Sequence, residues 1–328
     1  MGVKIAKLAK KGKKKTSLKD LQGKVIAIDA YNLLFQFLTA IRYKDGTPLK
    51  DKQGRVISHL SGLFYRTLNL LALNIRPVYC FDGTHTILKH ETIKKRKKIR
   101  EQAKQKAKKS RERGNIETAQ KYAKMSSTLN LNMIEESKKL LEYFGVPFIQ
   151  SPGEGEAQAA YMTDKGDAWA IVSQDYDALV FGAKRFLKNL APKKRSKLSD
   201  KLEYISLTKM VNCLNITQEQ LVDMAILIGT DFFSGVKWVG QKTALKLVKK
   251  HGNLESIINS GEKIRGKPIG VEKETIQNLR NIFLEPRIKR NYKELMWNKP
   301  RIEDLHSFMI EHHDFSRERI ENALNRLI

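Results

Sequence analysis

Three short apolar runs in this chain each end on an aspartate. The runs are VIAID, PVYCFD and AWAIVSQD, and they end at Asp29, Asp82 and Asp175. Runs rich in β-branched and aromatic residues predict buried strands of a parallel sheet. Open α/β sheets bind their ligands at the carboxyl ends of such strands, so the three carboxylates should lie on one rim.

Further acids follow in motifs that should reach the same rim: Glu154 and Glu156 in SPGEGEAQ, Asp177 in DYD, and Asp231 in GTDFF. Carboxylates gathered on one rim repel one another, and divalent metal ions relieve that repulsion. Mg²⁺ prefers oxygen ligands, and a pair of ions about 4 Å apart suits phosphodiester hydrolysis. Taken singly, Asp29 could be a helix cap, and Glu154 and Glu156 could be partners of a helix dipole. The metal-site hypothesis therefore depends on the coincidence of seven acids.

The charge of the whole chain has the opposite sign to this rim. Lys and Arg number 62 against 35 Asp and Glu, which gives a formal net charge of +27 in 328 residues. Such an excess indicates a polyanionic partner, and nucleic acid is the first candidate. The alternative is a soluble protein with solvated basic faces.

Targeting and redox signals are few. The two cysteines, Cys80 and Cys213, form no zinc spacing and no disulfide framework. No apolar stretch is long enough to span a membrane, and the N-terminus lacks the apolar region of a secretory signal. These features predict an intracellular protein in a reducing compartment.

Two segments depart from the α/β pattern of residues 25–82 and 143–182. Residues 89–113 hold thirteen Lys or Arg and three Glu, which predicts a polar helical arm over the site or, alternatively, a solvated charge run.

Residues 217–251 read as helix, glycine-bounded turn and helix. Such a turn can aim backbone N–H groups at a phosphate, and the following helix adds its dipole. The residues expected to bind DNA there are Gly235, Gly240, Lys237, Lys242 and Lys246.

Several motifs together resemble the flap endonuclease family in its archaeal-like form: IAIDAYNLLFQFL, SHLSGLFYRT, VYCFDG, SPGEGEAQAAYM, SQDYDALVFG and IGTDFFSGVKWVGQKTALKL. The resemblance implies a structure-specific 5′ nuclease with 5′-3′ exonuclease activity, acting in Okazaki fragment maturation and DNA repair. It also implies an α/β fold of the PIN-like kind, in which a twisted central mixed or parallel sheet is flanked by helices. A helical arch would cover two Mg²⁺ ions, for which Mn²⁺ can substitute. A helix–two-turn–helix element would hold duplex DNA beside a K⁺ ion.

The resemblance also implies roles for individual residues. It makes metal ligands of Asp29, Asp82, Glu154, Glu156, Asp175, Asp177 and Asp231. Lys89 and Arg96 match a pair that contacts the scissile phosphate, Phe35 matches an aromatic that stacks on a base, and Gly2 matches an N-terminus close to the site. Phe35 could instead be a core residue of an amphipathic helix. The K⁺ ion would be held by backbone carbonyls of Gly235, Val236 and Val239.

The same resemblance divides the chain into regions. Residues 1–105 and 143–228 form one nuclease core, with 106–142 continuing the arch between them. Residues 217–255 form the helix–two-turn–helix element, and 256–328 form a C-terminal helical region.

The expected partner is branched DNA carrying a 5′ flap, and the protein is expected to be a monomer with no membrane association. It would be cytoplasmic in an archaeal-like cell and nuclear in a eukaryote. The chain ends ENALNRLI, without the family's peptide for binding the sliding clamp, so the sequence leaves open a truncated end or an absence of clamp binding. The remaining alternatives are a related 5′-3′ exonuclease, a four-way-junction resolvase, a small toxin-type ribonuclease and a catalytically inactive DNA-binding scaffold.

Overall fold

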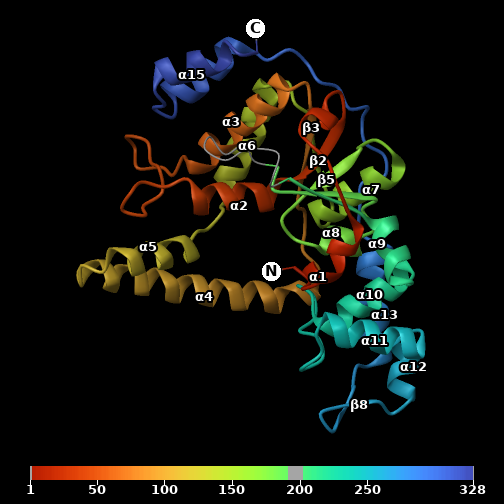
Figure 1. Ribbon diagram of the computed structural model, residues 1–328. Helices are drawn as coiled ribbons and strands as arrows, with labels where there is room; N and C mark the ends of the chain where they lie inside the picture. Colours follow the sequence, from red (N-terminus) through yellow and green to blue (C-terminus); the bar gives the residue numbers. More distant parts are fainter. Residues whose placement is uncertain (1, 191–201, 328) are drawn as a thin grey trace.

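The computed structural model describes residues 2–190 and 202–327, and a seven-stranded sheet lies at its centre (Figure 1). The strand order is β1-β7-β6-β5-β2-β3-β4. The strands are β1 (Lys13–Lys14), β2 (Val25–Asp29), β3 (Arg76–Phe81), β4 (Phe148–Gln150), β5 (Ala170–Val172), β6 (Arg185–Lys188) and β7 (Glu203–Ser206). The five strands from β6 to β4 run parallel, whereas β7 and β1 pair antiparallel, so the predicted mixed sheet is confirmed.

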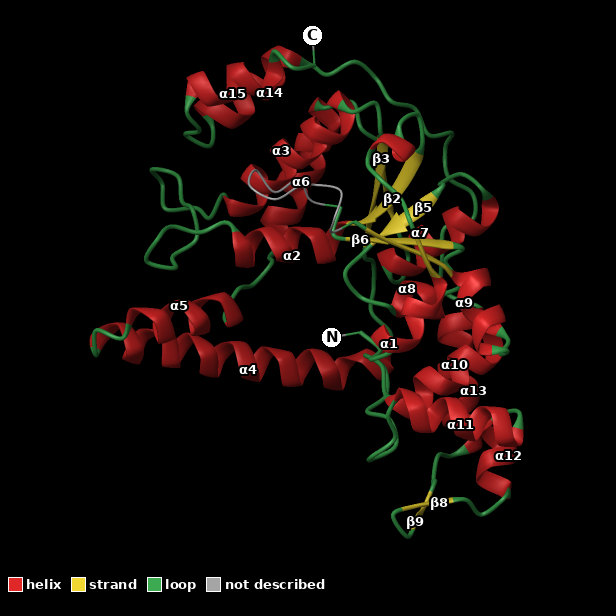
Figure 2. Ribbon diagram, in the orientation of Figure 1, coloured by secondary structure: helices red, strands yellow, loops and turns green. Residues whose placement is uncertain are grey.

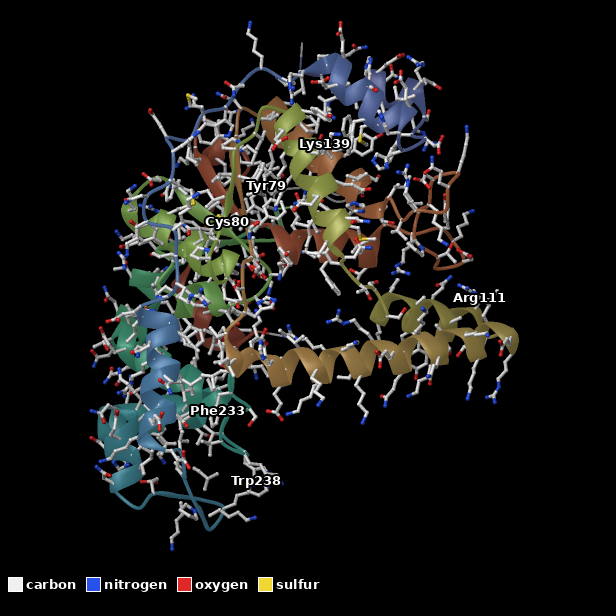
Figure 3. All side chains as sticks on the ribbon, turned by 180° about the vertical axis from the view of Figure 1, so that it is seen from behind. Tyr79, Cys80, Arg111, Lys139, Phe233 and Trp238 are labelled. Atoms are coloured by element: carbon white, nitrogen blue, oxygen red, sulfur yellow. The ribbon has the colours of Figure 1, made fainter. Side chains whose placement is uncertain are left out.

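Helices cover both faces of the sheet, as the alternation along its central strands requires. Ile26 and Ile28 of β2 belong to one buried cluster and Ala27 belongs to the other. In the same way, neighbouring residues Tyr79 and Cys80 of β3 enter opposite clusters (Figure 3). The first face packs against α2 (Ala30–Ala40), α3 (Ser58–Ala72) and α6 (Leu131–Tyr143), and the second packs against α7 (Gly155–Lys165), α8 (Asp177–Val180), α9 (Leu207–Leu214) and α10 (Gln218–Ile228).

One of the sequence-based boundaries needs correction. The strand expected to end at Asp175 ends at Val172, because the chain turns there and the Asp175 N–H bonds to the Ser173 hydroxyl at 3.2 Å. After the basic segment come two separate helices, α5 (Ile116–Met125) and α6. The break follows from a run of polar residues, at the end of which Asn130 caps α6 by accepting from Met133 N–H.

Ser58, at the start of α3, does not cap that helix. The capping position is Ile57, and Ser58 is the first residue of α3. Its hydroxyl instead donates to the Ile41 carbonyl at 2.8 Å and accepts from Leu49 N–H at 2.9 Å. Ser58 therefore fastens the loop between α2 and α3 rather than the helix end.

The basic segment is one long helix, α4 (Ile87–Glu112), which projects from the body of the molecule with α5 folded back along it (Figure 1). Only Lys89 and Ala103 of its residues are buried. The helix therefore belongs to neither core cluster, as its sparse apolar face predicted.

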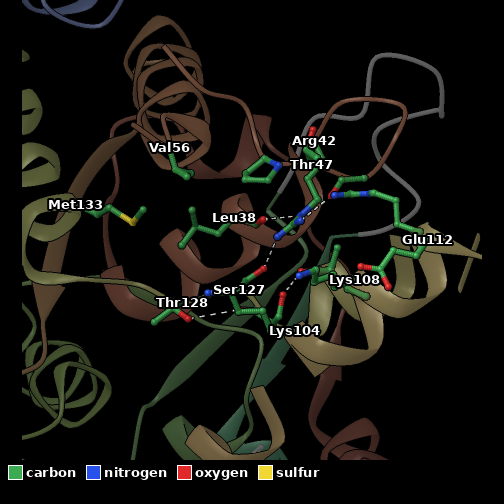
Figure 4. A pocket seen from close by; sticks show the side chains of 16 residues that line it. Leu38, Arg42, Thr47, Val56, Lys104, Lys108, Glu112, Ser127, Thr128 and Met133 are labelled. Atoms are coloured by element: carbon green, nitrogen blue, oxygen red, sulfur yellow. Dashed lines mark hydrogen bonds between the residues drawn. The ribbon is translucent and has the colours of Figure 1, made fainter. Parts of the chain in front are cut away.

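The far side of this arm is tied to the loop that follows α2. A pocket of about 610 Å³ lies between them (Figure 4). Arg42 donates to the carbonyls of Leu38 and Gly46, at 2.9 and 2.7 Å, and also to the Ser127 hydroxyl beyond α5. The arm is thus anchored where α4 begins and again just after α5 ends.

The C-terminal third extends the second face and then returns to the first. After α10 come α11 (Gln241–His251), α12 (Leu254–Asn259), a hairpin of β8 (Lys263–Ile264) and β9 (Lys267–Pro268), and α13 (Lys273–Leu284). The chain then passes back to α14 (Ile302–His306), a π-helical turn (Ser307–Glu311) and α15 (Arg317–Leu324), which pack near α3 and α6. Short N-terminal turns complete the fold: α1 (Ala6–Ala9), η1 (Lys10–Gly12) and η2 (Lys19–Leu21). No helix within residues 2–190 and 202–327 is long and apolar enough to cross a membrane.

The helices around α10 are joined by a buried ionic contact. Asp223 of α10 accepts from Arg280 Nε and Nη2, both at 2.8 Å, and from Leu254 N–H at 2.9 Å. Asp223 is buried, and Arg280 also pairs with Glu255 at the surface. One carboxylate therefore connects α10, α12 and α13.

We expect Asp223→Ala to lower the free energy of unfolding by about 2–4 kcal/mol, because it leaves a half-buried guanidinium and a buried N–H short of an acceptor. Glu255→Ala is the matched control and should cost about 1 kcal/mol or less, since that carboxylate is partly solvated. Denaturant titration of both variants makes the comparison. Equal losses of unfolding free energy in the two variants would show that Asp223 does not stabilise the packing of these helices more than Glu255 does.

Candidate active site

All seven carboxylates singled out in the sequence line one cavity of about 660 Å³: Asp29, Asp82, Glu154, Glu156, Asp175, Asp177 and Asp231. It lies at the carboxyl ends of β2 and β3, beside the first turns of α4 (Figure 2). Lys89, Arg96 and Phe35 line it as well. The fold therefore brings every predicted metal ligand and both predicted phosphate-contacting cations to one place.

Asp29 and Asp82 are fixed by the strands that carry them and by the helices that follow. Asp29 ends β2 and caps α2 by accepting from Asn32 N–H at 3.0 Å. Asp82 follows β3 directly and accepts from Gly155 N–H at 2.7 Å. Burial, with repulsion from Asp82, raises the pKa of Asp29 well above its usual value. Burial and the charge of Glu154 raise the pKa of Asp82 to about 6.

Glu154 has a basic environment instead. It pairs with Lys89 and lies 3.4 Å from His85 Nδ1. Burial disfavours its charge, but the hydrogen bonds and charges of His85 and Lys89 hold its pKa below the usual value. Asp82, His85 and Glu154 offer ligand atoms that all lie within 4.8 Å of one another, which is a spacing that could hold a metal ion. His85 was not recognised in the sequence, where a lone histidine after a strand gives little signal.

A second group of acids is held by the N-terminal segment. Asp177 accepts from Val3 N–H at 2.5 Å, and Asp175 accepts from Gly2 N–H at 3.4 Å and from Asn32 Nδ2 at 3.0 Å. A Cβ on Gly2 would lie 2.8 Å from both Asp175 Cβ and Asp177 Oδ1. The N-terminus is therefore packed directly against the acids, and only glycine fits at this position.

Glu156 lacks any such partner for one of its oxygens. Its Oε1 atom is buried and has no hydrogen-bond partner. Burial, with repulsion from Asp177 and Asp29, raises the pKa of Glu156 well above its usual value. A buried, unpartnered carboxylate oxygen among like charges is what a divalent cation would satisfy, so the residues present fit a metal site.

The two cations predicted to contact the scissile phosphate are each paired with an acid. Lys89, which is buried, binds Glu154, and Arg96 places Nη2 2.6 and 2.7 Å from the two carboxylate oxygens of Asp231. Both arise from one face of α4, which explains how this helix can reach the acids. The cavity thus contains cations that can bind an anion once their carboxylates are otherwise occupied.

Phe35 is half-buried and faces the cavity, unlike its neighbour Leu34, which packs in the core. The Arg100 guanidinium lies 5.8 Å from its ring centroid. The alternative that Phe35 is an ordinary core residue is therefore wrong.

Sequence and structure comparisons agree over the whole chain. The XPG N-terminal domain family matches residues 1–103, and the XPG I-region family matches residues 145–231. Flap endonuclease 1 of Ignicoccus hospitalis is 47% identical, covering 97% of this chain and 91% of its own length, and that of Methanobrevibacter smithii is 46% identical, covering 100% and 96%. The solved structure of flap endonuclease-1 from Methanococcus jannaschii matches with a TM-score of 0.75 at 38% identity over 99% of this chain and 98% of that one.

The chain belongs to the flap endonuclease family. The catalytic core of Rad2 in complex with DNA substrate is also similar, with a TM-score of 0.79 at 24% identity over the full length of both chains, which is a likeness of fold. The predicted fold class and the resemblance proposed from the motifs are both confirmed.

The turn between α10 and α11 is compact. Gly235 has φ +77°, and a Cβ there would lie 2.5 Å from Gly229 N. Val236 N–H bonds to the Leu227 carbonyl at 2.8 Å. Gly240 precedes α11, and a Cβ there would meet nothing within 4 Å, so close packing within the protein does not require that glycine. Lys237, Lys242 and Lys246 are exposed.

The raised pKa of Asp177 predicts that the free energy of unfolding of the metal-free protein depends on pH. Burial and nearby acids raise this pKa from 3.8 to about 7, so the folded protein keeps a proton that the unfolded chain releases over that range. The buried group therefore destabilises the fold increasingly as pH rises through this window. We expect Asp177→Asn, in the presence of a chelator, to gain on the order of 4 kcal/mol of unfolding free energy relative to the wild type as the pH rises from 3.8 to about 7. A difference in unfolding free energy that does not change with pH would contradict the assignment.

Proposed function

We propose that this chain is a structure-specific 5′ flap endonuclease with 5′-3′ exonuclease activity, which hydrolyses a phosphodiester near the base of 5′ flaps in Okazaki fragment maturation and DNA repair. The observation that carries the proposal is the single cavity in which seven carboxylates meet the cations of α4, within a chain of net charge +27. An acidic site in a basic protein is suited to binding polyanionic DNA and cleaving it with metal ions.

Two divalent ions, Mg²⁺ or in its place Mn²⁺, fit the acids described above. The residues that would hold them are the seven acids of the cavity: Asp29, Asp82, Glu154, Glu156, Asp175, Asp177 and Asp231. When bound, such ions supply an activated water and neutralise charge on the leaving oxygen. With Glu154 and Asp231 engaged as ligands, Lys89 and Arg96 would be available to bind an anion.

The protein's own groups then bind and orient the DNA. Lys89 and Arg96 contact the scissile phosphate, with Arg96 able to grip two oxygens through its planar fork. Phe35 offers a half-buried ring on which a base beside that phosphate can stack. Gly2 keeps the N-terminus close without filling the space that the substrate needs.

The turn after α10 binds the duplex away from the cut. Gly235 and Gly240, with Lys237, Lys242 and Lys246, present backbone and charge to phosphates, and the carbonyls of Gly235, Val236 and Val239 hold a K⁺ ion. Branched DNA with a 5′ flap is the proposed partner, and the protein acts as a cytoplasmic monomer. Residues 1–105 and 143–228 form one nuclease core in this proposal. The central sheet, which joins strands from both ranges, supports that division.

The rival functions account for less of the site. An inactive scaffold has no use for the seven acids, because burial, together with their mutual repulsion, raises the pKa of several of them. A small toxin-type ribonuclease would lack both α4 and the turn. A 5′-3′ exonuclease or junction resolvase shares the same chemistry and differs in the substrate it prefers.

We expect Mg²⁺ or Mn²⁺ to support cleavage of a labelled 5′-flap DNA, and Ca²⁺ to support binding without turnover. The larger and looser coordination shell of Ca²⁺ misplaces the attacking water. Gel analysis of the products under each ion makes the test. Strong cleavage in excess chelator would contradict the two-metal proposal.

A further inference from the structure

Trp238 combines three features that rarely occur together in a surface side chain. It is 42% exposed, its φ is +65°, and it lies in the turn between α10 and α11. A left-handed backbone conformation is unfavourable for a bulky residue, because its Cβ lies too close to the following carbonyl oxygen. A glycine would allow the same backbone path without that cost.

A second residue of this kind lies directly beside it. Arg265, at the tip of the β8–β9 hairpin, has φ +48° and is followed by Gly266 at +78°, a two-residue turn that asparagine and glycine favour. In the described part of the chain the other non-glycine residues with positive φ are asparagine or aspartate, which tolerate it: Asn74, Asn189, Asn215 and Asp314. The two residues that do not tolerate it are in contact, with the Arg265 guanidinium 5.5 Å from the Trp238 ring centroid.

The ring is surrounded by positive charge. Lys237 lies 4.7 Å and Lys267 5.8 Å from its centroid. The nearby acid on the hairpin, Glu262, is already paired with Lys250 and His251. The patch lies at the end of the molecule that carries the hairpin, well away from the arm with Arg111 (Figure 3).

We propose that Trp238, Arg265 and Lys267 form a contact platform for the sugar–phosphate backbone of duplex DNA, built where the β8–β9 hairpin lies against the turn that precedes α11. The cations neutralise phosphates while the exposed ring packs against a sugar between them. This inference rests on the proposed function, because it assigns the platform to the duplex arm of the same substrate. Strained surface residues that the fold itself does not need are typical of binding sites.

The test uses 5′-flap DNA whose downstream duplex is lengthened one base pair at a time, with binding measured by fluorescence anisotropy in Ca²⁺. The wild type should gain affinity at the lengths where the duplex first reaches the platform. Trp238→Gly should lack that gain and bind the longer duplexes roughly fivefold more weakly. Arg265→Asn, which keeps a residue suited to the left-handed turn, should also lower the salt dependence of binding by about one unit of slope. Lys299→Ala, an exposed cation removed elsewhere, is the charge control.

Thermal unfolding separates binding from a structural role. Trp238→Gly should melt no lower than the wild type, because the strained conformation is relieved. Addition of long-duplex DNA should change tryptophan emission in the wild type and change it much less in Trp238→Gly, since Trp169 and Trp297 are partly buried.

A lower melting temperature with unchanged binding would overturn the platform and make Trp238 a structural residue. Unchanged binding with unchanged stability would also overturn the platform. The partner of this positively charged patch would then be an acidic protein instead of DNA. An affinity loss of equal size at every duplex length would place Trp238 nearer the cut. The proposed function is tested separately: it is contradicted if the wild type does not cleave flap DNA. Even then, the dependence of binding on duplex length can still be measured.

Discussion

Asp177→Ala and Asp82→Ala are each expected to reduce the single-turnover rate of 5′-flap cleavage by at least about a thousandfold, while DNA binding stays near the wild-type level. Each variant removes a carboxylate from the cavity, buried for Asp177 and partly buried for Asp82, and with it a group proposed to orient a metal ion. Binding depends on Lys and Arg contacts elsewhere, and loss of a negative charge reduces repulsion toward phosphate. Quenched-flow cleavage with enzyme in excess, paired with anisotropy in Ca²⁺, measures the two effects independently.

Asp164→Ala is the control for these variants. Asp164 is an exposed acid of α7, the helix that also carries Glu156, and its partner is the surface residue Lys184. It should cleave at the wild-type rate. A wild-type rate in either Asp177→Ala or Asp82→Ala would remove that residue from the set of metal ligands.

Arg96→Ala is expected to slow the chemical step about 30- to 1,000-fold, which corresponds to roughly 2–4 kcal/mol of lost transition-state stabilisation. Arg96 is the cation of α4 that grips both oxygens of Asp231, so its fork is already directed into the cavity. Affinity for the substrate should fall much less than the rate, because many other cations hold the DNA. Arg96→Lys should recover only part of the rate, since an ammonium cannot make the planar two-point contact.

Lys97→Ala removes the same charge from the neighbouring, exposed position of α4 and should affect the rate little. If Arg96→Ala instead kept the wild-type rate and only raised the dissociation constant, Arg96 would be a docking residue. Measuring both parameters in the same preparation decides between these outcomes.

The acids at strand ends were predictable because a short apolar run in the local sequence indicates a buried strand, and the acids follow such runs. Asp29 and Asp82 lie where the apolar runs end. Asp175 was placed near the rim for the right reason although its strand ends at Val172, since a side-chain turn through Ser173 replaces the last part of the strand. The long basic helix was also predictable, because helix-favouring residues without an apolar face form a helix that stays out of the core.

Other parts of the site depend on contacts between distant segments, and no local pattern encodes them. Asn32 reaches Asp175 across 143 positions of sequence, and Val3 reaches Asp177 across 174. His85 becomes a candidate ligand only because β3 and α7 bring Asp82 and Glu154 together around it. The cost at Trp238 depends on a backbone conformation, which its residue type would not predict.

The central claim, a metal-dependent 5′ nuclease that recognises DNA structure, is tested most directly by one side-by-side measurement. Labelled 5′-flap, nicked, gapped and four-way DNA are cleaved with Mg²⁺ under single-turnover conditions, and the rates are compared. We expect the fastest cleavage on the 5′ flap, near its base, and weaker exonucleolytic activity on the nicked and gapped substrates. Preferred cleavage of the four-way junction, or equal rates on all four, would contradict it.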